Sequence, residues 1–559
     1  MNNKNKSLLI FAIAAIIFLS IGVYTIKHTS YTVSEPIYVM AGYYYLTEHQ
    51  TFQTGHPIAT HILSAIPLLF IHIDKPEASA IYHPFEFARN DFLYYGNNNP
   101  DTIMFLARLP FLLLSLLFAW YIFRWTKELY GLFPGTIALI LYIFNPDIIG
   151  SSILVMTDIA VAGFLMISCY YLWKYFKTEK RKHLILTGIF FGLAISSKST
   201  AIFIIPAYLL MFFMYRKAEG FKWNLKKLAI IALLGVLIFS SINIFDFAPV
   251  YNQNNPFYTQ SEGSRTEERL QNITEAYTSN PLLQKIIIFS LEKVPIPGSS
   301  SLAAYAVQIK HSGDGQAQYL FGDYSAHGVW YYYLFVFAVK TPIPLLILFL
   351  ISICLLMKEK GNWKEKITLL LPITVIGFIF SFIVRLNLGL RHVLIILFFI
   401  IIISASAFQW KRYKKKIIPI LLLLLVIWYI AESIWIAPSY LAYFNEFIGP
   451  ENAPDYLIDD SLDLGQDLIK LGTYVHENNI TSLKLKYSGF EKPEYRDINY
   501  ENLSCEETNG TIAVSVNALY GGKFWYEGDQ KINQDCYAWL REKEPIAKIG
   551  YTIYVYSLP

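Results

Sequence analysis

Long apolar segments recur along most of the chain and are separated by short polar connections. A helix needs about 20 apolar residues to cross the hydrocarbon core of a bilayer. Eleven segments approach that length: 8–26, 103–123, 132–146, 158–173, 184–197, 200–214, 228–245, 334–357, 367–384, 392–409 and 417–435. The pattern predicts a polytopic α-helical membrane protein with about 11 transmembrane helices.

The charges of the connections predict the orientation of these helices. Every second connection is rich in Lys and Arg: "RWTK" (124–127), "KYFKTEKRK" (174–182), "RKAEGFKWNLKK" (216–227), "KEKGNWKEK" (358–366) and "KRYKKK" (411–416). Cytoplasmic loops carry such an excess of basic residues. We therefore expect a multi-pass protein of the cell membrane with a cytoplasmic N-terminus. The first apolar run is long for a signal peptide and no clear A-x-A site follows it, which favours a retained helix.

Three long segments are then expected on the outer side of the membrane. Residues 1–435 form a transmembrane domain with outer loops at 27–101 and 246–328, and residues 436–559 form an extracytoplasmic C-terminal domain. This last portion contains stretches of alternating hydrophobicity: "SLKLKYSG", "TIAVSV" and "IGYTIYVYSL". Such alternation is typical of strands, so we expect a small α/β domain.

Composition agrees with this reading and excludes some classes of protein. Hydrophobic residues make up 54% and charged residues 16% of the chain, which does not fit an ordinary soluble domain. The net charge of +4 is too small to indicate nucleic acid as a partner. Cys505 and Cys536 fall in the expected outer domain, where they could form a disulfide. No spacing of Cys and His suggests a zinc site.

Ionisable side chains from separate parts of the chain are expected at one outer level of the membrane. These are Glu35 after the first span, Arg108 and Asp158 near the ends of their spans, Lys198 in a short outer turn, and Arg385, Asn387, Arg391 and His392 in another. Charged groups at the edge of the hydrocarbon are costly and usually face a cavity. Two carboxylates with several cations suit a site that binds an anionic phosphate and deprotonates an acceptor.

Simpler explanations exist for several of these residues. Arg385 could extend its guanidinium to the headgroups, and Asp158 could serve only as an acid at a helix N-terminus. His61 and His83 are typical of satisfied loop histidines, and Glu48 of a solvated loop acid. Glu35 fits such a role less well, because "SEP" predicts the start of a local helix beside the membrane.

Seven blocks of sequence resemble a known family. They include "SEPIYVMAGYYYLTE", "HPIATH", "ARLPFLLL", "MTDIAVAGF", "GLAISSKSTAIFIIP", "LNLGLRHVLII" and "YLAYFNEFIGPENAPDYLIDDSLDLGQDL". In this order they are similar to the GT-C glycosyltransferases of the protein O-mannosyltransferase type (glycosyltransferase family 39 and its bacterial and archaeal relatives). The chain departs from the family pattern at two positions. Ser34 stands where the first, catalytic acid of a D-E pair is usual, and Ile58 replaces the second proline of H-P-P-L.

The resemblance implies a transferase that uses a lipid-linked sugar donor. A hexose, mannose-like, would pass from a polyprenyl (dolichyl-type) phosphate to a hydroxyl on a protein, lipid or glycan acceptor, with inversion. Glu35 and Asp158 would be catalytic: Glu35 would take the proton from the acceptor hydroxyl, and Asp158 would orient the acceptor. The donor phosphate would be bound by Arg391, Lys198, Arg108 and His392, and the acceptor side of the site would be lined by His56, Tyr38 and Asn387. No cofactor is certain, although Asp158 could help to hold a divalent cation.

Two alternatives belong to other classes of protein. A transporter would also place charged groups within a helical bundle. It would be expected to show repeated halves and polar or Gly/Pro-broken helices at mid-membrane, neither of which the sequence indicates. A non-catalytic homologue could bind a polyprenyl phosphate without turning it over. The replacement of the family's acid by Ser34 leaves this second alternative open.

Overall fold

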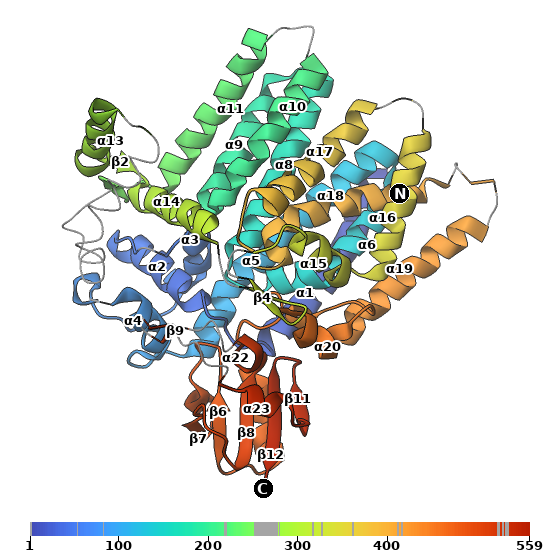
Figure 1. The fold of residues 1–559 in the computed structure, drawn as a ribbon. Coiled ribbons are helices and arrows are strands. Elements are labelled where there is room, and N and C mark those ends of the chain that lie inside the picture. Colours follow the sequence, from blue (N-terminus) through green and yellow to red (C-terminus); the bar gives the residue numbers. More distant parts are fainter. Residues whose placement is uncertain are drawn as a thin grey trace.

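The fold is seen in a computed structural model (Figure 1). It describes residues 3–52, 54–81, 83–216, 221–250, 278, 280–315, 318–325, 328–359, 361, 363–410, 413–414, 417–521, 526–527, 530–531 and 536–559. Long helices form the upper part of the molecule in this view, and a small sheet lies at the bottom. Part of the expected outer loop 246–328 falls outside the described residues.

Seven helical segments in the described parts of the chain are long and apolar enough to cross a membrane. They are α1 (Asn3–Lys27), α5 (Pro100–Tyr130), α8 (Thr157–Thr178), α11 (Phe221–Ile242), α17 (Trp363–Phe382), α19 (Ile417–Ile436) and the segment Leu390–Phe408, which contains α18 (Leu394–Ala405). Two bent helix pairs raise the number to nine. The protein is therefore a polytopic helical membrane protein.

Each of the eleven predicted spans coincides with helical structure, although two of them are shorter than a full span. One is α9 (Arg181–Ser197), and the other is a 3-10 turn (Ser199–Ile204) followed by α10 (Ile205–Arg216). By length and composition the structure thus supports seven to nine crossings in its described parts, compared with the predicted eleven. The difference comes from length alone, since these two segments also carry exposed apolar side chains such as Ile185, Leu209 and Phe213.

The two bent pairs correct one argument made from the sequence. Helix α6 (Leu132–Ile143) meets α7 (Pro146–Ser152) at 62°, and α15 (Tyr332–Lys340) meets α16 (Ile343–Lys358) at 111°. Pro146 and Pro342 stand at these breaks, where a proline cannot continue the preceding helix. Broken helices are therefore present, and their expected absence cannot be used against a transporter.

Helix α18 forms the centre of the membrane part. All of its residues from Leu394 to Ala405 are buried, and it packs against α5, α6, α8, α16 and α17. A helix that is hydrophobic on every side is stable only when other helices surround it. This central helix begins directly after Arg391 and His392, so the packing of the bundle also fixes the place of these two residues.

Shorter elements lie beside the long helices, and several come from the two expected outer loops (Figure 1). They are α2 (Glu35–Glu48), α3 (Ala59–Ala65), α4 (Pro84–Asn90), α13 (Pro281–Lys293), α14 (Ser299–Asp314), β1 (Phe247–Ala248), β2 (Ile296–Pro297), β3 (Gln318–Leu320) and β4 (Asp323–Ser325). Strand β3 pairs with β4 and also with β5 (Leu457–Ile458). The second outer loop is therefore joined to the C-terminal part of the chain.

The C-terminal part contains the expected α/β unit. Its main sheet has the order β11-β12-β8-β6-β7, with parallel pairs β8–β6 and β6–β7 and antiparallel pairs elsewhere. These strands are β6 (Leu483–Lys486), β7 (Tyr500–Asn502), β8 (Gly510–Ser515), β11 (Ala547–Ile549) and β12 (Ile553–Leu558). The remaining elements are α20 (Gly449–Tyr456), α21 (Leu468–Glu477), α22 (Val516–Gly521), α23 (Ala538–Arg541), β9 (Tyr526–Glu527) and β10 (Gln530–Lys531).

The predicted strands and disulfide of this part are confirmed. The stretches "SLKLKYSG", "TIAVSV" and "IGYTIYVYSL" coincide with β6, β8 and β12, whereas β7 and nearly all of β11 lie outside them; Cys505 is bonded to Cys536. Leu468, Leu471 and Val475 of α21 pack on the apolar face of the sheet. The connection from 439 to 467 instead contacts the membrane helices: the Asn445 side chain donates to Ala338 O and Thr341 O at 2.7 Å.

Candidate functional site

Four charged side chains from distant parts of the chain meet where α8 begins. Asp158 lies in the first turn of α8, where the helix dipole favours a carboxylate. Its Oδ1 accepts a hydrogen bond from Lys198 Nζ at 2.6 Å, and its Oδ2 lies 4.0 Å from Arg391 Nη1. Arg391 also forms an ion pair with Asp460 through Nη2 and donates from Nη1 to Met156 Sδ at 2.7 Å. We call Asp158, Lys198, Arg391 and Asp460 the charged cluster.

Three adjoining cavities have both Asp158 and Arg391 in their walls. The largest of them has a volume of about 120 Å³ and is also lined by Ser34, Tyr38 and His56. Asp158 is only 4% exposed and Lys198 only 3%. Asp158 and Lys198 are therefore almost enclosed, whereas the Arg391 and Asp460 side chains are 19% and 35% exposed. The charged cluster thus borders open space, as a site that binds a charged ligand requires.

Two histidines and a tyrosine lie beside the charged cluster. His392 Nδ1 lies 3.4 Å from Lys198 Nζ. Burial, reinforced by the charge of Lys198, lowers the pKa of His56 to about 3, so this imidazole is neutral at physiological pH. Burial also raises the pKa of Tyr38 to about 12, and its ring lies edge-on to that of His56 at 5.9 Å. His56 and Tyr38 thus supply uncharged polar groups to the largest cavity.

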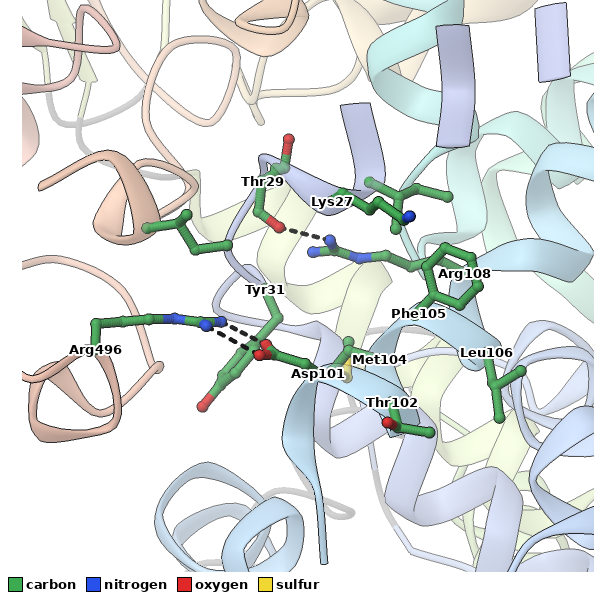
Figure 2. A pocket seen from close by; sticks show the side chains of 12 residues that line it. Lys27, Thr29, Tyr31, Asp101, Thr102, Met104, Phe105, Leu106, Arg108 and Arg496 are labelled. Carbon is green, nitrogen blue, oxygen red and sulfur yellow. Dashed lines mark hydrogen bonds and ion pairs between the residues drawn. The ribbon is translucent and has the colours of Figure 1, made fainter. Parts of the chain in front are cut away.

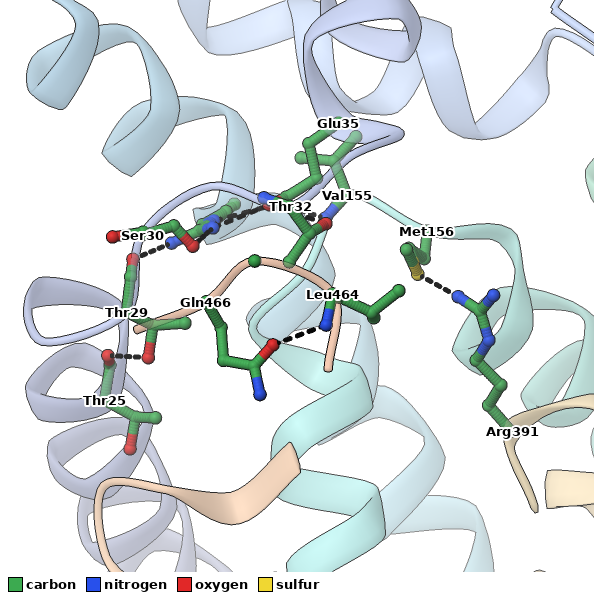
Figure 3. Close-up of polar contacts among 12 residues, drawn as sticks. Thr25, Thr29, Ser30, Thr32, Glu35, Val155, Met156, Arg391, Leu464 and Gln466 are labelled. Atoms are coloured by element: carbon green, nitrogen blue, oxygen red, sulfur yellow. Dashed lines mark hydrogen bonds and ion pairs between the residues drawn. The ribbon is translucent and has the colours of Figure 1, made fainter. Parts of the chain in front are cut away.

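Glu35 lies outside the charged cluster. Its carboxylate is fully buried and accepts hydrogen bonds from Arg108 Nε at 2.9 Å and Nη2 at 2.6 Å, from Thr32 N at 2.7 Å, and from Val155 N at 2.9 Å. Figure 3 shows this network on one side of the turn at Val155–Met156 and Arg391 on the other. Since that turn leads directly into Asp158, Glu35 supports the backbone of the charged cluster without lining the three cavities.

Arg108 is likewise directed away from the charged cluster. Besides Glu35, its guanidinium donates to Thr29 O at 2.8 Å and Ser30 O at 2.9 Å. It borders a different cavity of about 420 Å³ between α1, α5 and the C-terminal part, where Arg496 is paired with Asp101 (Figure 2). In this structure Arg108 is therefore not grouped with Lys198 and Arg391.

Asn387 also has a structural contact. Its amide donates to Val329 O at 3.2 Å, and it does not line the three cavities that meet at Asp158. Of the nine residues expected at the site, the structure brings six together: Asp158, Lys198, Arg391, His392, His56 and Tyr38. Glu35, Arg108 and Asn387 lie outside this group.

The sequence reading missed one member of the charged cluster and a second ion pair beside it. Asp460 belongs to the quoted block "DDSLDLGQD", but five acidic or amide side chains in that block gave no reason to select it. Lys340, at the bend between α15 and α16, lies 3.6 Å from Asp147 of α7 and donates to Ser461 O at 2.7 Å. Lys340 thus ties both bent pairs to the loop that carries Asp460.

The donor set around Asp158 does not fit a resident divalent cation. Its carboxylate is already neutralised by Lys198 and approached by Arg391. Among the residues that the structure describes, no group of three or more His, Cys, Asp or Glu side chains could hold a metal ion. Such ions prefer several oxygen ligands that are not paired with cations.

The loop that supplies Asp460 also contains a buried acid with an unusual titration. Burial raises the pKa of Asp463 to about 7, and its Oδ1 accepts from Gly465 N at 2.9 Å. The folded state therefore favours the protonated carboxyl, whereas the unfolded chain ionises above about pH 4. The stability that this residue contributes is full below about pH 4 and is lost as the pH rises to about 7.

We expect the Asp463→Asn variant, whose side chain stays neutral at all pH values, not to show this decrease in stability between pH 4 and 7. The stability of the variant relative to the wild type should rise between pH 4 and 7 by on the order of a few kcal/mol. Thermal unfolding midpoints of both proteins, measured across this range, give the result. A difference that does not change with pH would contradict the assignment.

Comparison with known proteins gives a partial match to a family. Residues 101–245, which are 145 of the 559 residues, match the family model described as dolichyl-phosphate-mannose-protein mannosyltransferase. This segment contains Asp158 and Lys198 but not Arg391. No curated protein sequence matches the chain at the significance required.

Several solved structures are similar over long stretches at low identity. The apo oligosaccharyltransferase of Archaeoglobus fulgidus shares 14% identity over 91% of this chain and 62% of its own, with a TM-score of 0.47. The S. cerevisiae Pmt1–Pmt2 complex bound to the sugar donor shares 18% identity over 46% of this chain and 35% of its own, with a TM-score of 0.33. ArnT of Cupriavidus metallidurans bound to undecaprenyl phosphate shares 10% identity over 99% of this chain and 98% of its own, with a TM-score of 0.32. The chain thus spans about three fifths of the oligosaccharyltransferase, and such similarities do not define an activity.

Proposed function

We propose that the protein is a membrane glycosyltransferase that uses a lipid-linked sugar. It would move a hexose, mannose-like, from a polyprenyl (dolichyl-type) phosphate to a hydroxyl acceptor at the outer face of the membrane. One observation carries the proposal: a buried Asp158 stands between Lys198 and Arg391 where three cavities meet. Two of these residues fall within the segment that matches the mannosyltransferase family model, and this match favours the mannose donor.

The cations of the charged cluster suit a phosphate leaving group. The guanidinium of Arg391 presents several N–H donors in a fixed plane, which matches phosphate oxygens. Lys198 adds a second positive charge, and His392 lies beside it. In a nearly enclosed site these charges stabilise a developing phosphate more strongly than they would in water.

The carboxylate of Asp158 suits the acceptor side of the reaction. In a single displacement the acceptor oxygen forms a bond to the anomeric carbon while the bond from that carbon to the phosphate oxygen breaks. The phosphate leaves with the electron pair, the configuration inverts, and the hydroxyl proton passes to Asp158. Oδ2 can receive it, because Lys198 occupies Oδ1 and Arg391 Nη1 is 4.0 Å away, beyond hydrogen-bonding distance.

In this proposal Glu35 and Arg108 are positioning residues. Glu35 supports the turn before Asp158 through Val155 N, and Arg108 neutralises Glu35. Ser34, which stands where the family has its first acid, lines the largest cavity but cannot ionise in the same range. We therefore assign the role of general base to Asp158, while Tyr38 and His56 line the acceptor side. No step uses a metal ion.

The orientation of the chain is part of the proposal. The positive-inside pattern supports a cytoplasmic N-terminus and places the start of α8 on the outer side, together with the C-terminal domain. The lipid tail of the donor would then lie among the helices. The acceptor would be a protein, a lipid or a glycan outside the membrane.

A transfer assay with a matched pair of variants tests the proposal. Purified protein in nanodiscs is given radiolabelled polyprenyl-phosphate hexoses and hydroxyl acceptors, and transfer is measured. Arg391→Gln should weaken donor use, raising KM by about tenfold or more, since a charge-assisted phosphate contact is lost. Arg385→Gln removes the same charge from an exposed position in the same loop and should have no effect.

The outcomes separate the proposed enzyme from the two alternatives. Donor binding without transfer by the wild type would identify a non-catalytic binder of polyprenyl phosphate. Transport of the lipid-linked sugar without transfer would favour a transporter. Equal effects of Arg391→Gln and Arg385→Gln on donor use would show that the charged cluster does not bind the donor.

A further inference from the structure

Figure 1 shows the C-terminal end of α19 beside α20. A further cavity, separate from the four described above, is lined by residues of this end of α19 and by the first residues of α20. Its volume is about 310 Å³, and its walls contain Trp428, Glu432 and Trp435 of α19 together with Tyr443 and Glu446 of the following connection. It shares no lining residue with the cavities at Asp158. The proposed sugar transfer therefore does not account for it.

Glu432 is the unusual residue of this cavity. It lies in the last turns of a membrane-length helix and is only 8% exposed. Its Oε2 accepts a hydrogen bond from the Tyr443 hydroxyl, and its Oε1 accepts from no N–H or O–H donor among the described residues. Its other interaction partner is a second carboxyl group, that of Glu446. An acid within a membrane span is costly and is usually retained for binding. Two interacting carboxyl groups in the wall of one cavity thus point to a ligand that can donate to both.

The other side chains of the cavity specify the charge of that ligand. Glu446 is a second acid, and its Oε1 accepts from the Trp428 indole N–H at 2.7 Å. None of the residues that line the cavity is Lys, Arg or His. Two carboxylates next to the rings of Trp428 and Trp435 form an acidic, aromatic site. This combination favours an ammonium group, which is attracted both by the carboxylates and by the faces of aromatic rings.

The surroundings of the cavity indicate where the ammonium group comes from. Trp435 is 61% exposed, and Ile427 and Ile434 on the same helix are 61% and 63% exposed. Such apolar exposure on a membrane-length helix is typical of a lipid-facing surface, and Trp is enriched at the level of the headgroups. We propose that this cavity binds the ammonium headgroup of a phospholipid, such as phosphatidylethanolamine, in the outer leaflet.

Native mass spectrometry of the full-length protein in detergent tests this site independently of sugar transfer. The protein is titrated with dioleoyl phosphatidylethanolamine and, separately, with dioleoyl phosphatidylglycerol, which has the same chains but no ammonium group. We expect the first molecule of phosphatidylethanolamine to bind about tenfold or more tightly than phosphatidylglycerol. Glu432→Gln should abolish this preference, whereas Glu451→Gln, which alters an exposed acid on α20 outside the cavity, should retain it.

A second variant keeps the test decisive if Glu432→Gln does not fold. Trp435→Leu preserves both carboxylates but removes an aromatic wall, and it should reduce the preference several-fold. Equal binding of the two lipids by the wild type, or a preference unchanged in both variants, would overturn the proposal. Competition by free ethanolamine at the concentration at which the lipid binds would show that the site takes a soluble amine, which would overturn the headgroup assignment.

Discussion

Asp158→Asn is expected to lower kcat/KM for sugar transfer by about a thousandfold or more. The substitution keeps the size of the side chain and can still accept from Lys198, but it removes both the proton acceptor and the negative charge between Lys198 and Arg391. Loss of a general base typically costs 10²–10⁴-fold, and loss of a charge from a nearly enclosed site adds to it. Steady-state transfer rates in nanodiscs provide the measurement.

The control for this variant is Glu128→Gln. Glu128 is also an acid paired with a lysine, since it lies 3.0 Å from Lys174. Its partner is near the C-terminal end of α8, whereas Asp158 is at the N-terminal end, and the Glu128 side chain is partly exposed. Its loss should leave transfer within about twofold, as expected for an exposed pair. Unfolding midpoints would show that both variants are folded. A folded Asp158→Asn protein with full activity would refute the role of Asp158.

Glu35→Gln is expected to destabilise the protein by about 3–5 kcal/mol, because it leaves the buried guanidinium of Arg108 without its counter-ion. Arg108→Met should have an effect of similar size, since it leaves the Glu35 carboxylate buried and unpaired. The double variant should be less destabilised than the sum of the two, as the two side chains interact directly. Chemical or thermal unfolding in detergent measures these differences.

Glu48→Gln provides the comparison for this prediction. Glu48, the last residue of α2, is paired with Lys75, which follows the 3-10 turn Ile66–Phe70. Both side chains are partly exposed, so the loss of Glu48 should cost about 1 kcal/mol or less. If Glu35 were instead the catalytic base, Glu35→Gln would abolish transfer while stability remained unchanged. That result would give the role of general base to Glu35 and contradict its assignment as a positioning residue.

The sequence predicted those features that depend on local pattern. The apolar runs located all eleven helical regions, because a bilayer demands long uninterrupted apolar segments. The "SEP" sequence predicted that a helix begins at Glu35, and α2 does begin there, with Pro36 in its first turn. Asp158 was expected at the start of a span and lies in the first turn of α8. Strands β6, β8 and β12 of the C-terminal sheet followed from alternation in the same way, whereas β7 and β11 did not.

The sequence by itself therefore determined which segments are helices and strands and which charged residues stand at their ends. Only the tertiary structure decided how those charges are paired. Glu35 lies 73 residues from Arg108, and Arg391 lies 69 residues from Asp460. Hydrophobic periodicity specifies which face of an element is buried but not which neighbour covers it, so the packing around α18 and the bends at Pro146 and Pro342 decide which cations reach which acids.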